Sequence, residues 1–323
     1  MARCAKCGKE AVIRIPYARM WLCKEHFIEF FETRVLKAIR RYGLARKGDR
    51  ILVAVSGGKD SAALLSAMVE AAKELGIEVI ALHIDLGIGE YSRRNREAVE
   101  RLAHQLGTKL LVFDVEEVLG MSIPEMARRS RRPPCSVCGL VKRYVINAAA
   151  VELGVDAVAL GHNMDDMIAY VMKAFITQDL SNVHKLGPKT ESVKGAVGRI
   201  RPLYDTSERE ALAYALMKGL SFNHAECPHA LPGSIEREVK AFMNSLEREH
   251  PSIKVQLVRR FRKNLMEGRY CVTDSPSSVS RCPVCGLISD GGICSFCRLT
   301  KKLIGRYGGP LVREWFSQAA KRL

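Results

Sequence analysis

Short apolar runs alternate with helix-patterned segments along the middle of the chain, and no other sequence feature constrains the fold as strongly. The apolar runs occupy 51–56, 78–85, 109–115 and 157–162. Helical patterns follow them at 62–76, 93–107, 139–154 and 164–178, and the stretch 207–267 also reads as helical. Strands joined by such helices form right-handed crossovers and a parallel sheet covered on both faces. The sequence therefore predicts an α/β, doubly wound parallel sheet, whose ligands bind beyond the carboxyl ends of the strands.

The segment SGGKDS at 56–61 lies between the first apolar run and the first long helix pattern. Two glycines allow the backbone to curl around an anion, and the helix N-terminus offers free amides and a positive dipole. Lys59 and the hydroxyls of Ser56 and Ser61 add donors, and Asp60 is a candidate Mg²⁺ ligand. The segment does not fit the Walker A pattern. We expect a phosphate-binding loop here.

Each end of the chain carries four metal-ligand side chains, spaced C-x2-C-x15-C-x2-H and C-x2-C-x8-C-x2-C. Two close pairs of thiolate or imidazole ligands make a closed tetrahedral zinc site, which leaves the ion no open position for chemistry. We predict two structural zinc sites that either scaffold the fold or also contact RNA. Their ligands are Cys4, Cys7, Cys23 and His26 at one end and Cys282, Cys285, Cys294 and Cys297 at the other.

Four of the 11 cysteines remain outside these two sets. Cys135 and Cys138 form a central C-x-x-C, Cys227 follows downstream, and Cys271 is interpreted as an ordinary buried thiol. The first three are compatible with a thiol–disulfide pair at a helix N-terminus, or with a third zinc site that recruits His224 or His229. They are equally compatible with an iron–sulfur cluster that leaves one iron without a protein ligand. Spacing does not choose among these alternatives.

The chain is strongly basic, with 51 Lys and Arg against 35 Asp and Glu and a net charge of +16. The excess is distributed over 34–43, 128–132 and 259–263, which favours a polyanionic partner on a basic face of a folded body. The N-terminus has no apolar signal region, and the most apolar stretch, 145–160, is too short and too polar to cross a bilayer. We expect a cytoplasmic protein without a membrane partner, whose cysteines remain thiols or bind metal.

The loop motif SGGKDS resembles the PP-loop of the ATP pyrophosphatases, which cleave ATP between its α and β phosphates. LGHNMDD at 160–166 resembles the second nucleotide motif of that family, and LHID at 82–85 ends the strand where the family seats adenine. With the central cysteines and both terminal sets, the whole chain resembles the TtuA group of tRNA 2-thiouridine synthetases. This resemblance implies the HUP-like PP-loop fold, with a zinc finger at 1–32, a catalytic domain at 33–272 and a zinc ribbon and tail at 273–323.

The resemblance also implies roles for individual residues. A [4Fe–4S] cluster is expected on Cys135, Cys138 and Cys227. Spacing places Lys142 one helical turn after Cys138, where it either stabilises phosphate charge or is an ordinary solvated lysine, and Asp166 is expected to handle a proton or Mg²⁺. The expected catalytic residues are Cys135, Cys138, Cys227, Lys142, Asp60 and Asp166. The expected nucleotide contacts are Ala54, Val55, Ser56, Gly57, Gly58, Lys59, Asp60, Ser61, His83, Lys142, Gly161 and His162.

The implied activity is ATP-dependent 2-thiolation of tRNA. The enzyme would adenylate the C2 oxygen of a uridine and replace it with sulfur delivered through the cluster. Scarce Gln and Asn, 4 and 7 residues, favour a heat-adapted source and hence the T-loop uridine over the anticodon wobble uridine. The implied cofactors are ATP, Mg²⁺, two Zn²⁺ and one [4Fe–4S] cluster. The implied partners are tRNA, a thiocarboxylated ubiquitin-like carrier or sulfide as donor, and a second copy of the chain.

Two other interpretations have different consequences. Another PP-loop adenylating enzyme, such as a tRNA-lysidine-type ligase or an amide-forming synthetase, needs ATP but not the three central cysteines together. A nonenzymatic zinc-ribbon protein that binds RNA needs neither SGGKDS nor LGHNMDD, and an ATP-binding titration separates it from the enzymes.

Overall fold

A computed structural model of the protein describes residues 2–230, 232–270 and 280–323. Its centre is a six-stranded sheet with the strand order β5-β4-β3-β6-β8-β7. Neighbouring strands are parallel except β7, which runs antiparallel to β8, so the predicted doubly wound parallel sheet is confirmed. The strands are β3 (Arg50–Ala54), β4 (Glu78–Asp85), β5 (Lys109–Asp114), β6 (Ala157–Ala159), β7 (Lys189–Thr190) and β8 (Arg199–Ile200).

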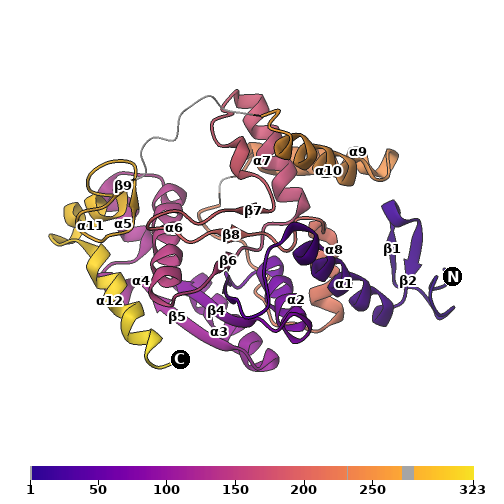
Figure 1. Cartoon of the computed structure of the whole chain (residues 1–323), viewed down its shortest axis with the longest axis horizontal. Coiled ribbons are helices and arrows are strands. Elements are labelled where there is room, and N and C mark those ends of the chain that lie inside the picture. Colours follow the sequence, from indigo (N-terminus) through magenta and orange to yellow (C-terminus); the bar gives the residue numbers. More distant parts are fainter. Residues whose placement is uncertain (1, 231, 271–279) are drawn as a thin grey trace.

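Helices cover both faces of the sheet (Figure 1). Alternate residues of a strand point to opposite faces, so Ile51 and Val53 join one buried cluster and Leu52 joins another. The first face is packed by α1 (Lys24–Tyr42), α2 (Lys59–Leu75), α3 (Gly89–Leu106) and α8 (Glu208–Met217). The second is packed by α4 (Val115–Leu119), α5 (Ile123–Ser130), α6 (Pro134–Glu152) and α12 (Gly308–Ala320).

Three further helices form a separate packed group beside the sheet (Figure 1). They are α7 (Met164–Thr177), α9 (Ile235–Glu249) and α10 (Ile253–Met266), and η2 (Val183–Lys185) follows α7. Met167 and Ile168 of α7 share a buried cluster with Val239 of α9 and Val258 of α10. The prediction of helix throughout 207–267 was wrong for 218–230 and 232–234, where Gly219, Pro228, Pro232 and Gly233 interrupt helical geometry, and for 250–252 between α9 and α10.

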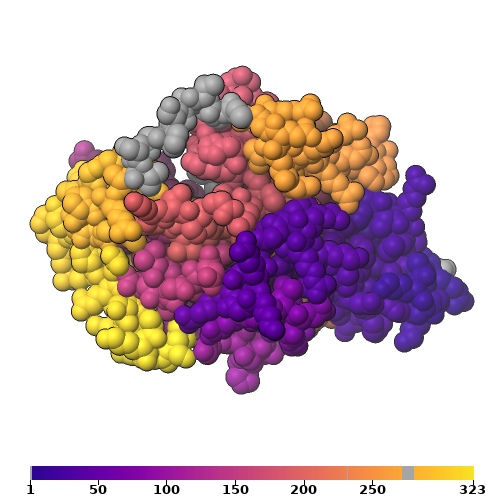
Figure 2. Space-filling view, viewed as in Figure 1, coloured from indigo at the N-terminus to yellow at the C-terminus, as the bar shows by residue number. Residues whose placement is uncertain are grey.

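The two ends of the chain form small modules that lie at opposite ends of the molecule (Figure 2). The N-terminal module, residues 2–26, contains β1 (Ile13–Ile15), η1 (Pro16–Ala18) and β2 (Met20–Leu22). The C-terminal module, residues 280–304, contains β9 (Ser280–Arg281), β10 (Ile288–Ser289) and α11 (Ser295–Ile304). Cys271 and the domain boundary predicted after residue 272 lie outside the described residues. No described helix is long and apolar enough to span a membrane.

Candidate active site and metal centres

The SGGKDS loop joins the carboxyl end of β3 to the N-terminus of α2, as predicted. The Ser61 hydroxyl donates to the Gly58 carbonyl at 2.9 Å and accepts from the Ser56 amide at 3.1 Å, which closes the loop on itself. Gly58 is the N-cap residue of the 17-residue helix α2 and gives it no side-chain cap. The amides of the first turn therefore remain available to an anion.

Gly57 is fixed in this loop by its surroundings. Its φ of 96° is disfavoured for other residues, and a Cβ there would lie 2.8 Å from the Asn95 side chain. Asn95 in turn accepts a hydrogen bond from the Asn223 amide at 2.9 Å, and the Asn223 backbone N–H donates to the Gly57 carbonyl at 2.8 Å. Neither asparagine was identified from the sequence, because they come from α3 and from the loop before α9.

The LGHNMDD motif lies directly against the phosphate-binding loop. A Cβ on Gly161 would lie 3.4 Å from the Ser61 backbone, so the two segments approach closely. Asn163 caps α7 and its side-chain amide donates to Asp60 at 3.1 Å. The His162 ring is largely buried against Tyr170, burial lowers its pKa, and its Nδ1 has no partner in the described part of the chain.

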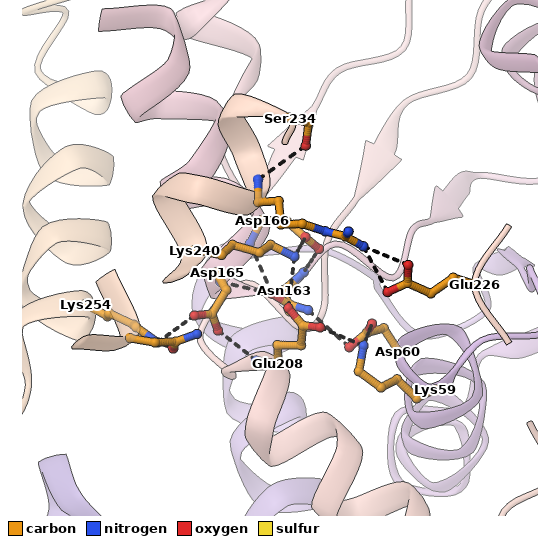
Figure 3. A network of polar contacts seen from close by, with 12 residues as sticks. Lys59, Asp60, Asn163, Asp165, Asp166, Glu208, Glu226, Ser234, Lys240 and Lys254 are labelled. Carbon is orange, nitrogen blue, oxygen red and sulfur yellow. Dashed lines mark hydrogen bonds and ion pairs between the residues drawn. The ribbon is translucent and has the colours of Figure 1, made fainter. Parts of the chain in front are cut away.

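Charged side chains from four elements converge beside the loop. Figure 3 shows Lys59 and Asp60 of α2, Asp166 of α7, Glu208 of α8 and Lys240 of α9 around Asn163. Lys59 contacts Asp60 at 3.0 Å and Glu208 at 2.7 Å. Burial raises the pKa of Asp60, although Lys59 opposes the rise. For Glu208, hydrogen bonds to Lys59 and Lys240 outweigh burial and lower the pKa to about 2.

The two adjacent aspartates of α7 face different partners, as helix geometry predicts. Asp165 is buried and pairs with buried Lys254 at 2.6 Å. Asp166 accepts from the Asn163 backbone N–H at 3.1 Å and pairs with Lys240 at 2.5 Å. Asp165 thus joins α7 to α10, whereas Asp166 belongs to the charged group beside the phosphate-binding loop.

His83 lies on β4 with only 2% of its surface exposed. Its Nδ1 is 2.9 Å from the Val55 carbonyl, which can only accept, so Nδ1 carries the proton. Burial lowers the pKa of the ring and keeps it neutral at pH 7. The buried Nε2 is then an acceptor without a partner among the described residues, next to the loop.

The first turn of α6 carries the central cysteine pair. Cys135 is exposed and Cys138 is half-buried, and Cys227 reaches them from the loop between α8 and α9. Burial raises the pKa of Cys138; the charge of Lys142 opposes this, and Cys227 and Cys135 add to it. The Cys135 thiol donates to the His229 carbonyl at 3.3 Å. The structure therefore gathers all three cysteines and Lys142 at one place.

The two terminal sets are tighter than this central group. Within each set the ligand atoms lie within 4.8 Å of one another, as four ligands of one ion require. Gly8 and Gly286, each directly after a second cysteine, have φ of 72° and 74° and form tight turns there. Among the described residues no third group of four side chains is this compact. The structure thus contains two preformed metal sites, one in each module.

The SGGKDS loop lies where the strand order reverses, between β3 and β6, which is where doubly wound folds bind nucleotides, and its motif is that of the PP-loop class of nucleotide-binding enzymes. Residues 28–228 match the PP-loop domain model, and residues 3–28 match the N-terminal LIM domain model of the 2-thiouridine synthetase TtuA. The chain belongs to this family, within the TtuA-type group of ATP-dependent tRNA 2-sulfurtransferases.

Individual relatives cover nearly the whole chain. The tRNA-5-methyluridine(54) 2-sulfurtransferase of Pyrococcus horikoshii is 39% identical and covers 92% of this chain and 93% of its own. The protein of the same name from Thermus thermophilus is 38% identical, with 92% and 90% covered. Among solved structures, the U34-tRNA thiolase NcsA from Methanococcus maripaludis with its [4Fe-4S] cluster superposes with a TM-score of 0.77 at 27% identity. This match covers 94% of this chain and 96% of NcsA.

Proposed function

We propose that this sulfurtransferase 2-thiolates uridine 54 in the T-loop of tRNA. One observation carries the proposal: Cys135, Cys138, Lys142 and Cys227 gather on and beside the first turns of α6, near the PP-loop. An adenylating enzyme without sulfur chemistry has no need of this group. The two relatives at 38% and 39% identity, both named for position 54, support the choice of the T-loop.

We assign the nucleotide to the loop and its neighbours. The free amides of α2 and the Lys59 ammonium would bind the phosphates, and Asp60 is placed to hold Mg²⁺. The unpartnered Nε2 of His83 would accept a hydrogen bond from the adenine amine. Lys142 would stabilise charge on the departing AMP, and Asp166 would handle a proton or contact Mg²⁺.

The donor set of the central group fits an iron–sulfur cluster. Three cysteines supply three of the four ligands of a [4Fe–4S] cluster, and their spread is wider than that of the single-ion sites. When bound, such a cluster supplies an iron that can carry the sulfur to be transferred. The chain itself holds Cys138 and Cys227 half-buried beside Lys142, which limits the access of water to the reacting groups.

The donor sets of the two terminal sites fit zinc. Cysteine and histidine are its preferred ligands, and four of them leave the ion no open position. We therefore assign both ions structural roles.

We assign tRNA as the partner of the basic surface, which is consistent with the net charge of +16. Its affinity should fall steeply with salt, because each neutralised phosphate releases counterions. The sulfur donor would be a thiocarboxylated ubiquitin-like carrier or sulfide, the working form a homodimer and the compartment the cytoplasm.

The test is to map the thiolated nucleoside. The protein, purified without oxygen, is incubated with unmodified tRNA, ATP and sulfide, and the product is located by nuclease digestion and mass spectrometry. We expect sulfur at uridine 54 and one AMP released for each sulfur transferred. The match to the U34-tRNA thiolase favours the wobble uridine as the second candidate, and sulfur at uridine 34 would establish it instead.

Cysteine variants test the central group separately. Changing Cys135, Cys138 or Cys227 to Ala should remove iron and thiolation together, while ATP binding persists because the PP-loop is a separate element. Exposed Ser136, in the same turn of α6, provides the matched control, and Ser136→Ala should retain both iron and activity. Full thiolation by iron-free protein would rule out the cluster and favour a thiol–disulfide mechanism.

A further inference from the structure

The Asp166 carboxylate is held at both of its oxygens. Oδ2 accepts from the Asn163 backbone N–H at 3.1 Å, which is half of the capping box of α7. Oδ1 lies 2.5 Å from the ammonium of Lys240. The first contact belongs to helix α7 itself. The second comes from α9, so the orientation of this side chain depends on a separate element of the fold.

Lys240 contacts a second carboxylate of the same group. Its ammonium lies 2.9 Å from Oε2 of Glu208, whose other oxygen lies 2.7 Å from Lys59 of the PP-loop. Two carboxylates that share one ammonium would repel each other without it. Lys240 therefore joins Asp166 to Glu208 and, through Glu208, to the lysine of the phosphate-binding loop (Figure 3).

The surroundings of Lys240 hold its side chain in a fixed position. Only 26% of its side chain is exposed, and it extends from the same face of α9 as buried Val239 and Met243, which pack on α7. Burial acts to lower the pKa of Lys240, but Asp166 and Glu208 outweigh it and raise the pKa well above its ordinary value. The ammonium is therefore charged at neutral pH.

We propose that Lys240 is a positioning residue of the thiolation site, which fixes Asp166 relative to the PP-loop. The proposal rests on the role assigned to Asp166 under the proposed function. Residue 240 lies outside the segment 28–228 that matches the PP-loop domain. The helical group of α9 and α10 therefore contributes a residue to this site that the matched domain does not contain.

The chain offers a matched control for Lys240. Lys173 of α7 pairs with Glu236 of α9 at 2.6 Å, so it links the same two helices through an ion pair of similar length. It lies two turns along α7 from Asp166, away from the PP-loop. Replacing Lys173 therefore removes a tie between the helices without touching the charged group.

The experiment compares Lys240→Met, Lys240→Arg and Lys173→Met in anaerobically prepared, iron-loaded protein with tRNA, ATP and sulfide. A misplaced catalytic group costs roughly 10- to 100-fold in rate, so Lys240→Met should lower kcat by about that factor. KM for ATP should change by less than about threefold, since the loop amides remain. Lys240→Arg should recover most of the rate, and Lys173→Met should retain all of it.

A double variant tests whether Lys240 acts through Asp166. Asp166→Asn combined with Lys240→Met should be no slower than Asp166→Asn alone, because the group being positioned is already lost. Multiplied losses would overturn the proposal. So would a kcat for Lys240→Met within twofold of the parent, an equal loss in Lys173→Met, or an arginine variant no better than the methionine variant.

The outcome for Asp166→Asn separates the two levels of inference. If Asp166→Asn thiolates at the full rate, the role assigned to Asp166 under the proposed function fails, and the positioning role of Lys240 fails with it. If Asp166→Asn is inactive while Lys240→Met remains fully active, only the positioning role of Lys240 is overturned.

Discussion

The N-terminal and C-terminal modules each gather four metal ligands, but they are built into the molecule differently. In the N-terminal module Cys7 is exposed, and the β1–β2 hairpin projects from the end of α1 (Figure 1). In the C-terminal module all four ligands are buried within the hydrophobic cluster that also contains α6. Cys4 and Cys23 of the N-terminal module are buried in the cluster that contains α1 and α2, so this set is partly exposed, whereas the C-terminal set is fully enclosed.

The contact between the C-terminal module and α6 is extensive. Tyr144 of α6 stacks on Phe296 with ring centroids 3.8 Å apart and planes 9° apart. Arg313 of α12 donates to the Cys285 carbonyl at 2.7 Å and also pairs with Glu152 at the end of α6. The helix whose first turns carry Cys135 and Cys138 thus contacts the metal module at Tyr144 and α12 at Glu152.

The largest expected effect comes from opening the C-terminal metal site. Cys285→Ala should lower the free energy of unfolding by more than about 5 kcal/mol, because the binding free energy of a structural metal is folding free energy. Cys7→Ala should instead loosen only the N-terminal hairpin. Urea unfolding is followed by the fluorescence of the two tryptophans. Trp315 packs against the cluster that contains α6, and Trp21 lies in the N-terminal hairpin, so each reports on one region. Equal destabilisation by both variants would contradict the comparison.

The next effect concerns the stacked aromatic pair. Phe296 is 1% exposed, and Phe296→Ala should cost about 3–5 kcal/mol in unfolding free energy through the cavity it leaves. Thiolation and retained iron should fall with it, because α6 loses its support. The control is Phe242→Ala on α9, whose side chain is 59% exposed and should matter little. Unchanged iron content in a destabilised Phe296→Ala protein would show that α6 does not need this support.

A smaller effect is the difference in the rates at which the two modules lose their metal. A chelator reaches the exposed Cys7 directly, whereas the C-terminal ligands become accessible only through local opening. The fluorescence of Trp21 should therefore change before that of Trp315, and metal release should proceed in two phases. Single Trp→Phe variants assign each phase, and a single phase seen by both probes would show that the modules open together.

The smallest expected effect is that of Trp21→Ala. The ring is 41% exposed and Arg14 lies 5.9 Å from its centre, so its loss should change the unfolding free energy by less than about 0.5 kcal/mol. If the N-terminal module contacts RNA, the same variant should weaken tRNA binding, since exposed aromatic rings stack on bases. Filter binding at fixed salt measures this, and unaltered affinity would leave the module a purely structural role.

The fold was predictable where the sequence pattern is local. β4 was predicted at its observed limits, and α8 begins within the stretch predicted as helical, at a capping box formed by Ser207 and Glu210. The short strands β7 and β8 were missed because two residues each carry no periodic signal. β6 ends at Ala159, earlier than the predicted 162, because the chain turns there into the LGHN segment.

The same distinction applies to the site. SGGKDS, LGHNMDD and the cysteine sets are compact patterns, so their residues could be named from the sequence alone. Glu208 and Lys240 could not, because each is an ordinary charged residue on a helix and gains its place only from the tertiary structure. Glu208 is 149 residues from its partner Lys59, and no local signal relates the two.

Helix α1 joins the N-terminal module to the body of the protein without an intervening linker. Cys23 is its N-cap residue and His26 lies in its first turn, while Val35 and Ile39 further along are buried against the sheet. A helix of 19 residues is about 28 Å long and bends little, so it moves as one rigid element. The hairpin can therefore swing only as far as α1 tilts as a whole. An RNA that binds both the hairpin and the body would find the two surfaces already held at a fixed separation. Binding would therefore cost little conformational entropy of the protein.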